Sequence, residues 1–334
     1  MMLRAELDRC EGAPGAGAVS RVSIVICTYN RAAQLQDGLQ AIESQDTRGI
    51  PAIEVVIVDN NSADETRAVV EAYSRRSRFA VKYVPEPRQG IGYARNAGIN
   101  AASGDVILYI DDDAQADPDW ARAMVRCFME TDADIVGGSI IPVWVVARPS
   151  WLSDEHLGPV IASNKTGGRS HCAPGTTFLT ANMGVRRASV SRFGAFNVSL
   201  GVRGSLRRGG EDVDLCRRWG SSGASLYYES AARVRHPVDA QRVSESFYRS
   251  WYEGIGFTEG HRAPWKWHHR LTIMPLWQWW KLAKAYSVLT SRVLLTRDRD
   301  KRFQGELWYR YQRSYLEERF AHWLHRGSCP FLED

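Results

Sequence analysis

Four apolar segments in the first third of the chain each end abruptly in polar residues. They are residues 22–27, 53–58, 81–84 and 106–110. Between them, apolar residues recur at helical spacing, as Leu35, Leu39 and Ile42 do. Strands that alternate with helices in this way predict an α/β fold with a parallel sheet.

The polar residues that follow the apolar segments form a second regularity. Residues 28–31 (TYNR) follow the first segment, 59–60 (DN) the second and 111–113 (DDD) the fourth. In open parallel sheets, ligands bind in the crevice beyond the carboxyl ends of the strands. We therefore expect these three polar tips to converge on one cleft.

The run of Asp111, Asp112 and Asp113 is the least expected feature at the end of an apolar segment. Adjacent carboxylates repel one another and resist burial unless a positive charge compensates them. Side chains alternate along a strand, so Asp111 and Asp113 should point to one side and Asp112 to the other. Two carboxylates on one side can share Mg²⁺ or Mn²⁺, which often also bind a substrate phosphate. The alternative is that these acids cap the following turn or helix.

Length and composition limit the class of protein. The chain has 334 residues, 44% of them hydrophobic and 24% charged, as in compact globular proteins. No apolar run is long enough to span a bilayer, and residues 1–20 carry charges where a signal peptide needs an apolar core. The six cysteines lack the spacing of a zinc site and indicate reduced thiols. We therefore expect a cytoplasmic protein.

Four landmarks in the sequence, taken in order, resemble those of family 2 glycosyltransferases with the GT-A fold. They are VSIVICTYNR, IEVVIVDNNSADET, RQGIGYARNAGINAASGDVILYIDDD and GGEDVDLCRRW, all within residues 22–237. The resemblance implies a Rossmann-like, mixed and mainly parallel sheet flanked by helices. It also implies an enzyme dependent on Mn²⁺ or Mg²⁺. Such an enzyme moves a sugar from a nucleotide diphosphate sugar to an acceptor hydroxyl, with inversion at the anomeric carbon.

The resemblance assigns residues to the nucleotide pocket. Thr28, Tyr29 and Arg31 would line the pocket, and Asp59 would contact the base. A carboxylate only accepts hydrogen bonds, so Asp59 suits the imide N–H of uracil or thymine and favours UDP or dTDP sugars. Capping a helix is the alternative role for Asp59.

The same resemblance places further residues around the diphosphate. Arg95, in the ARN element, would support the donor sugar or its diphosphate, and Asp111 and Asp112 would also contact the nucleotide. The metal shell would consist of Asp111, Asp113 and His236, because imidazole is an acceptable third ligand for Mn²⁺. A purely structural role is the alternative for His236.

Sugar transfer also needs a carboxylate that removes the proton of the acceptor hydroxyl. Glu211 and Asp212 match the ED element of the family, which makes Asp212 the base and Glu211 a ligand for acceptor hydroxyls. Trp144, in the loop-rich region 142–176, could stack on the acceptor, and Asn182 would face the same pocket. The alternatives are that the acidic pair merely starts a helix and that the region is a plain surface loop.

The C-terminal part of the chain has a composition of its own. Residues 241–334 hold 16 Lys and Arg against 10 Asp and Glu, together with 8 of the 12 tryptophans. We expect a helical, aromatic extension. It could lie on the inner face of a membrane and present a lipid-linked acceptor, cap the catalytic domain or form a dimer interface.

These expectations divide the chain into four parts. They are a flexible N-terminal tail (1–20), a nucleotide-sugar-binding half (21–118), an acceptor-binding half with the base (119–240) and a helical C-terminal extension (241–334). The expected partners are a nucleotide-sugar donor and a carbohydrate or lipid-linked acceptor, as in polysaccharide, glycolipid or glycoconjugate synthesis. No nucleic-acid partner is expected.

Two other functions compete with sugar transfer. A sugar-nucleotide nucleotidyltransferase would share the fold and the metal. It would, however, carry a Gly-rich, basic triphosphate loop after the first strand, where this chain has TYNR. A nucleic-acid-binding or scaffold protein would use the basic aromatic extension, but it gives no reason for Asp111, Asp113 and Asp212.

Overall fold

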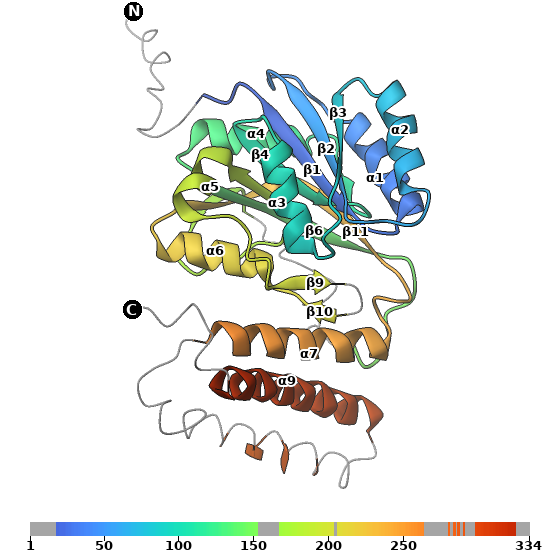
Figure 1. Cartoon of the computed structure of the whole chain (residues 1–334), viewed down its shortest axis with the longest axis vertical. Coiled ribbons are helices and arrows are strands. Elements are labelled where there is room, and N and C mark those ends of the chain that lie inside the picture. The colour runs from blue at the N-terminus through green and yellow to red at the C-terminus, as the bar shows by residue number, and fades with distance from the viewer. Residues whose placement is uncertain are drawn as a thin grey trace, which may run out of the picture.

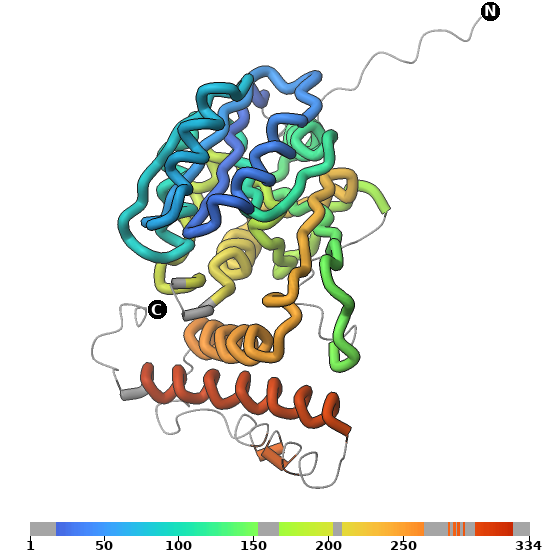
Figure 2. Tube along the Cα trace, turned by 90° about the vertical axis from the view of Figure 1, so that its right-hand side faces the viewer, coloured from blue at the N-terminus to red at the C-terminus, as the bar shows by residue number. Residues whose placement is uncertain are grey.

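The computed structural model describes residues 18–152, 167–203, 206–263, 280, 283–284, 286–287, 290 and 298–324. An α/β body forms most of the molecule, and a layer of two long helices lies against one end of it (Figure 1). The view turned by 90° shows the same arrangement, with the last long helix farthest from the sheet (Figure 2).

The first four strands build a parallel half-sheet. They are β1 (Val22–Thr28), β2 (Ile53–Asp59), β3 (Ala80–Pro85) and β4 (Val106–Asp111). β1 lies between β2 and β4, β3 follows β2, and all these pairings are parallel. The connections run through α1 (Ala32–Glu43), α2 (Thr66–Arg76) and α3 (Ile91–Ala101). The predicted alternation of strands and helices is therefore confirmed.

The other half of the sheet is mixed. Its strands are β5 (Gln115–Ala116), β6 (Ile135–Trp144), β7 (Arg169–Cys172), β8 (Asn182–Arg186) and β11 (Leu226–Val238). β8 lies antiparallel between β4 and β6, and β11 is parallel to β6 and antiparallel to β5 and β7. Among the described residues the strand order is β3-β2-β1-β4-β8-β6-β11-β5, with β7 beside β11. The expected mixed α/β sheet is confirmed.

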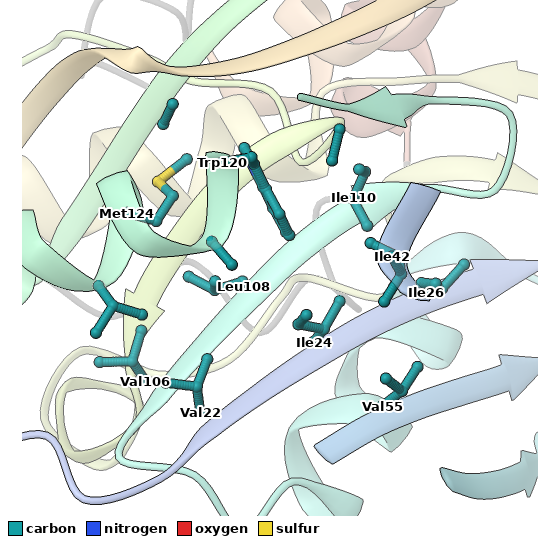
Figure 3. Close-up of a cluster of buried hydrophobic side chains, with 14 of the residues drawn as sticks. Val22, Ile24, Ile26, Ile42, Val55, Val106, Leu108, Ile110, Trp120 and Met124 are labelled. Atoms are coloured by element: carbon teal, nitrogen blue, oxygen red, sulfur yellow. The ribbon is translucent and has the colours of Figure 1, made fainter. Parts of the chain in front are cut away.

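Helices cover both faces of this sheet. The second half of the chain adds α4 (Trp120–Glu130), α5 (Arg187–Phe193) and α6 (Glu211–Ser221). Ile24 and Leu108 point to the face covered by α1, α2 and α4, and Figure 3 shows them near Trp120. The neighbouring residues Val25 and Ile107 point to the face covered by α3 and α6. Burial of both faces explains why these strands are continuously apolar.

The C-terminal extension is helical where the structure describes it, as expected. α7 (Glu245–Arg262) packs along α9 (Arg299–Leu324) and contacts β10 (Leu206–Arg208), the partner of β9 (Gly201–Arg203). A third apolar core joins the extension to the body. Its buried members are Leu152, Val238, Val243, Phe247, Tyr248, Phe303 and Leu307.

Membrane contact through the extension stays a prediction. None of the described helices combines the length and the apolar character needed to cross a bilayer. The stretch 264–279, which holds four of the tryptophans, lies outside the described residues, as do residues 1–17. The boundaries proposed for the four parts of the chain also stay predictions, and the sheet itself continues across the boundary at residue 118 through the pairing of β4 with β8.

Two glycines set the close approach of α7 and α9. A Cβ on Gly256 would lie 2.2 Å from the carbonyl oxygen of Tyr311, and a Cβ on Gly260 would lie 2.7 Å from that of Tyr315. The two glycines are four residues apart and therefore share one face of α7. Backbone atoms cannot yield as side-chain ends can, so larger residues would separate the helices.

We predict that Gly256→Ala lowers the free energy of unfolding by about 1–3 kcal/mol, the usual cost of overpacking. Gly220→Ala is the matched control, because a Cβ there meets its nearest atom at an ordinary 3.6 Å within α6. That control should be neutral or slightly stabilising, since alanine favours helix. Urea denaturation measures both values, and equal stability of the two variants would contradict the packing described for α7 and α9.

Candidate active site

The three consecutive carboxylates lie at the carboxyl edge of the sheet. Asp111 ends β4, and Asp112 and Asp113 form the turn that follows. Asp112 accepts a hydrogen bond from the Thr28 hydroxyl at 2.8 Å and another from the Arg31 guanidinium at 2.7 Å. Both oxygens of Asp112 are therefore held by the tip of β1.

Asp113 instead meets residues from β11 and beyond. His236 Nε2 lies 3.3 Å from Oδ1 of Asp113 and 3.9 Å from Oδ2 of Asp111. Oδ2 of Asp113 pairs with Arg242 at 3.0 Å and with Arg31 at 2.9 Å. Oδ1 is buried, and no described residue makes a hydrogen bond to it. Oδ2 of Asp113 is thus held by two arginines, whereas Oδ1 is available to a ligand.

Asp111, Asp113 and His236 could together hold a divalent cation. Each offers one ligand atom, and the three atoms lie within 4.8 Å of one another. Two carboxylates and an imidazole suit Mn²⁺, and the carboxylates also suit Mg²⁺. Asp111 is 38% exposed, so the cluster opens to the surface on that side. The available Oδ1 of Asp113 and this donor set fit the metal that the sequence predicts.

The surrounding charges keep Asp113 ionised. Burial alone would raise the pKa of its carboxyl, but His236, Arg242 and Arg31 outweigh burial and lower that pKa well below its usual range. For Asp112, burial prevails over Arg31 and raises the pKa to about 6. Asp113 is therefore the better cation ligand, whereas Asp112 ties β1 to β4.

The tips of β1 and β2 carry the other residues assigned to the nucleotide pocket. Tyr29 is 41% exposed and open to a ligand, while Thr28 is buried against Asp112. Asp59 is buried and accepts hydrogen bonds from the Ser62 backbone at 2.8 Å and the Tyr83 hydroxyl at 2.7 Å. Asp59 therefore caps the turn after β2. Each of its oxygens keeps a second lone pair that could accept a hydrogen bond from a base.

Arg95 lies inside the protein rather than on an open surface. Its guanidinium forms an ion pair with Glu211 of α6 and lies 5.6 Å from the centre of the Phe196 ring. Burial disfavours its charge, but Glu211, Asp212 and Asp111 together raise the pKa of Arg95 above its usual value. The positive charge of Arg95 thus interacts with the carboxylates that begin α6 and with Asp111 at the end of β4. A direct contact of Arg95 with the donor stays a prediction.

Glu211 and Asp212 begin α6. The preceding Gly210 has a φ of 99°, a left-handed conformation that favours glycine. Asp212 is buried, and its oxygens accept backbone N–H groups of Val213 at 2.7 Å and Thr180 at 3.3 Å. Oε2 of Glu211 is also buried, and no described residue makes a hydrogen bond to it.

The environment of Asp212 gives it the proton affinity of a base that works near neutral pH. Burial raises the pKa of its carboxyl to about 7, and the charge of Glu211 acts in the same direction against the opposing effect of Arg95. A general base is most effective when its pKa lies near the working pH. Asp212 can therefore take up a proton from a bound hydroxyl and release it again.

Thr258 of α7 holds the turn that precedes α6. Its hydroxyl donates a hydrogen bond to the carbonyl of Gly209. A Cβ on Gly210 would lie 2.8 Å from Cγ2 of Thr258, so the helix and the turn touch closely. The C-terminal extension therefore contacts the turn that presents the two carboxylates of α6.

The structure corrects the assignment of Asn182 to the acceptor site. Its side chain is 1% exposed, and Nδ2 donates to the carbonyls of Ser139 and Ala232, each at 2.8 Å. Its Oδ1 accepts the indole N–H of Trp120 at 2.8 Å. The Asn182 amide joins β8 to β6, β11 and α4, and it presents no surface to an acceptor.

Trp144, assigned to the acceptor, packs in part against the C-terminal helices, as does the nearby Trp151. Trp144 and Trp151 lie against the third apolar core. Trp151 makes edge-to-face contacts with Tyr248 and Phe303, with both centroid distances at 4.8 Å. The indoles attach the segment after β6 to the C-terminal helices. Trp144 therefore contributes to this packing, and its contact with an acceptor stays a prediction.

Sequence reasoning missed two residues that shape the site. Arg242 and Thr258 come from the segment assigned to the extension, and no local pattern links them to Asp113 or to Gly209. Asn60, which was expected at the cleft only as part of a polar strand tip, donates to two carbonyls of the loop before α3 and accepts the N–H of Gly90.

Comparison with known proteins agrees with this geometry. The family described as glycosyl transferase family 2 matches residues 23–193. This match covers half of the chain and includes β1 to β4, β6 and β8. The chain therefore belongs to glycosyl transferase family 2.

The relatives cover most of the chain. A glucosyl-dolichyl phosphate glucuronosyltransferase of Haloferax volcanii is 26% identical over 70% of this chain and 75% of its own length. The succinoglycan biosynthesis protein ExoM of Rhizobium meliloti is 28% identical over 67% of this chain and 69% of its own length.

Solved structures share the fold. The mannosyltransferase PcManGT from Pyrobaculum calidifontis, in complex with GDP-Man and Mn²⁺, has a TM-score of 0.60 at 19% identity and covers 95% of this chain and 90% of its own. TarS of S. aureus in complex with UDP-GlcNAc has a TM-score of 0.53 at 17% identity and covers 89% of this chain and 92% of its own. The body of the protein is therefore of the GT-A type.

We predict that Arg95→Met lowers the free energy of unfolding by about 3 kcal/mol or more, because it leaves the buried Glu211 without its cation. The double variant Arg95→Met with Glu211→Gln should regain part of that loss. Arg67→Met is the control, since Arg67 pairs with Glu71 on the surface and should cost less than about 0.5 kcal/mol. Chemical denaturation measures all three, and a double variant less stable than the single one would contradict this account.

Proposed function

We propose that the protein is an inverting, metal-dependent glycosyltransferase that moves a sugar from a nucleotide diphosphate sugar to an acceptor hydroxyl. The proposal rests on two groups of acidic residues that both interact with the buried Arg95. The cluster of Asp111, Asp113 and His236 fits a divalent cation, and Asp212, beside Glu211, fits a general base. Neither nucleotide transfer nor nucleic-acid binding gains support from the family match.

Asp212 takes the proton in this proposal. As the acceptor oxygen attacks the anomeric carbon, its proton passes to the Asp212 carboxylate, and the bond from that carbon to the diphosphate oxygen breaks. The Thr180 and Val213 backbone groups fix the orientation of the carboxylate. Oε2 of Glu211 accepts a hydrogen bond from the acceptor, while Arg95 fixes the other oxygen of Glu211.

Asp111, Asp113 and His236 would hold Mn²⁺ or Mg²⁺. Such a cation, when bound, stabilises the negative charge that develops on the leaving diphosphate. Arg31 and Arg242 pair with Oδ2 of Asp113 and leave its Oδ1 for the cation. The two guanidinium groups would also supply positive charge near a diphosphate bound to that cation.

The donor preference rests on Asp59. A carboxylate at the tip of β2 can accept the imide N–H of uracil or thymine, so UDP and dTDP sugars are favoured. The similar structures contain GDP-Man and UDP-GlcNAc, which supports a nucleotide-sugar donor and leaves the base to be determined. Tyr29 is exposed beside this position and is available to contact the nucleotide.

The acceptor is a carbohydrate or a lipid-linked sugar in this proposal. Support comes from the names of two relatives, one acting on a dolichyl phosphate glucoside and one belonging to succinoglycan biosynthesis. Oε2 of Glu211, to which no described residue makes a hydrogen bond, would receive an acceptor hydroxyl. Peripheral membrane contact through residues 241–334 would suit a lipid-linked acceptor.

We predict that donor binding depends on the metal. Calorimetric titration with UDP, dTDP, GDP and CMP in the presence of Mn²⁺ should give binding of UDP or dTDP, which EDTA should abolish. Asp113→Asn should bind the same nucleotide at least about tenfold more weakly, whereas Asp119→Asn, at an exposed position 63% open to solvent, should bind like the parent protein. Binding that EDTA leaves unchanged would contradict the metal assignment.

We predict that Asp212→Asn lowers turnover at least about a hundredfold while donor binding persists. Asp113→Asn should lower turnover by at least as much. Release of the nucleoside diphosphate from the donor identified by calorimetry measures the rate, and Asp119→Asn is again the control. Turnover within tenfold of the parent rate in Asp212→Asn would exclude Asp212 as the base.

The pH dependence tests the same residue independently. Protonated Asp212 cannot accept a proton, so kcat/KM should fall tenfold per pH unit below about 7 and level off above it. Glu211→Gln removes a negative neighbour, which should lower the pKa of Asp212 and move the acid limb to lower pH. The quantity to compare is the pH at the midpoint of the acid limb, measured at saturating Mn²⁺. The same midpoint in Glu211→Gln and in the parent protein would assign the titration to another group.

A further inference from the structure

A second cluster of metal-binding side chains lies in the C-terminal extension, away from the strand tips. It joins His261, in the last turn of α7, to Glu318 and His322 of α9. His261 Nδ1 lies 3.0 Å from Oε1 of Glu318, and His322 Nε2 lies 3.3 Å from the same oxygen. The three ligand atoms lie within 4.8 Å of one another.

Two of the three separations between these atoms are close to those of a tetrahedral metal site. Zinc bonds to imidazole nitrogen and carboxylate oxygen are about 2.0–2.1 Å long, so two ligands of a tetrahedron lie about 3.3 Å apart. The two nitrogen–oxygen separations in the cluster, 3.0 and 3.3 Å, are close to that value. Glu318 and His322 are four residues apart on one helix, which places both on the same face.

The packing of the two helices fixes the cluster in place. A Cβ on Gly260 would lie 2.7 Å from the Tyr315 carbonyl and 3.1 Å from Cβ of Glu318. The absence of a side chain at position 260 therefore lets α9 approach the residue before His261. The imidazole of His261 also stacks on the Phe257 ring with an interplanar angle of 19°. Helix packing, rather than a flexible loop, holds the ligands together.

The chemistry of the donors distinguishes this cluster from the one at the strand tips. Two imidazoles and one carboxylate favour Zn²⁺, whereas the strand-tip set, with two carboxylates, suits Mn²⁺ or Mg²⁺. The side chains of His261, Glu318 and His322 are 21%, 13% and 18% exposed, so an ion from solution could reach them.

We propose that His261, Glu318 and His322 form a zinc site that joins α7 to α9. Three protein ligands leave a fourth position for water. The site lies one turn of α7 beyond Thr258, which contacts the turn before α6. Zinc would therefore fix the helix that contacts the active-site turn, without taking part in sugar transfer.

The test is a calorimetric titration of the untagged full-length protein with ZnCl₂. The strand-tip cluster can also bind zinc, so the measurement is made in the Asp113→Asn background, which weakens that site. We expect one zinc ion per chain in this background. Adding His322→Ala should weaken binding at least about a hundredfold, because a direct ligand matters at least as much as the groups that orient one. Adding His171→Ala, at an exposed histidine outside the cluster, should change nothing.

Equal zinc affinity with and without His322→Ala would overturn the proposal, as would the absence of zinc binding in the Asp113→Asn protein. Either result would mean that the three side chains only share hydrogen bonds. Glu318→Gln gives a second arm should His322→Ala fail to fold, because glutamine keeps the shape and hydrogen bonds but loses the charge. In the Asp113→Asn background it should melt at the temperature of the zinc-free Asp113→Asn protein and lose the rise in Tm that zinc gives that protein. A Glu318→Gln, Asp113→Asn protein that zinc stabilises as much as the Asp113→Asn protein would also exclude the site.

Discussion

Buried carboxylates at one edge of the sheet must find cations or hydrogen-bond donors, and much of the fold is arranged around that need. The buried acids at this edge include Asp59, Asp112, Asp113, Glu211, Asp212 and Asp214. Arg31, Arg95 and Arg242 come from distant parts of the chain and pair with Asp112, Glu211 and Asp113, and Arg218 pairs with Asp214 within α6. Leaving such a group unpaired costs several kcal/mol. These ion pairs therefore tie β1, α3, α6 and the segment after β11 to one another.

Asp212 differs from the other buried acids in a way that bears on chemistry. Among the described residues it has no arginine at ion-pair distance, and only backbone N–H groups donate to it. Burial and the charge of Glu211 raise its pKa, whereas nearby cations outweigh burial and lower the pKa of Asp113. The same protein edge therefore offers one carboxylate that stays charged and one that exchanges its proton. A metal ligand and a base need these two properties respectively.

Local sequence was enough to predict the first half of the sheet, because its strands and helices have periods that short windows record. The positions of Asp111 and Asp113 at a strand end followed from the same pattern. His236 entered only through the family resemblance, since no spacing relates residue 236 to a strand tip more than a hundred positions earlier. Arg242 could not be predicted at all, because its contact with Asp113 depends on the pairing of β11 with β5, which follows the three aspartates.

The outcomes for Asn182 and Trp144 have a common physical cause. Residue type indicates what a side chain can bind but not the direction in which the fold points it. Asn182 was expected in a pocket, but a buried amide must satisfy all its hydrogen bonds, and strands β6 and β11 supply the partners. Trp144 was expected to meet a sugar, and the structure packs it in part against the third apolar core, which includes residues of the C-terminal helices. Both outcomes depend on contacts between segments that are distant in sequence.

The position of β8 in the sheet determines when the sheet can be completed during translation. β4 and β6 are adjacent in the chain, with only β5 and α4 between them, but they meet only through β8. The ribosome must therefore make more than half of the polypeptide before the open edge of β4 acquires its partner. Until then the parallel half-sheet exposes unpaired backbone groups, which other nascent chains can bind. Translation of the segment between β4 and β8 is thus the interval in which this enzyme is most open to aggregation.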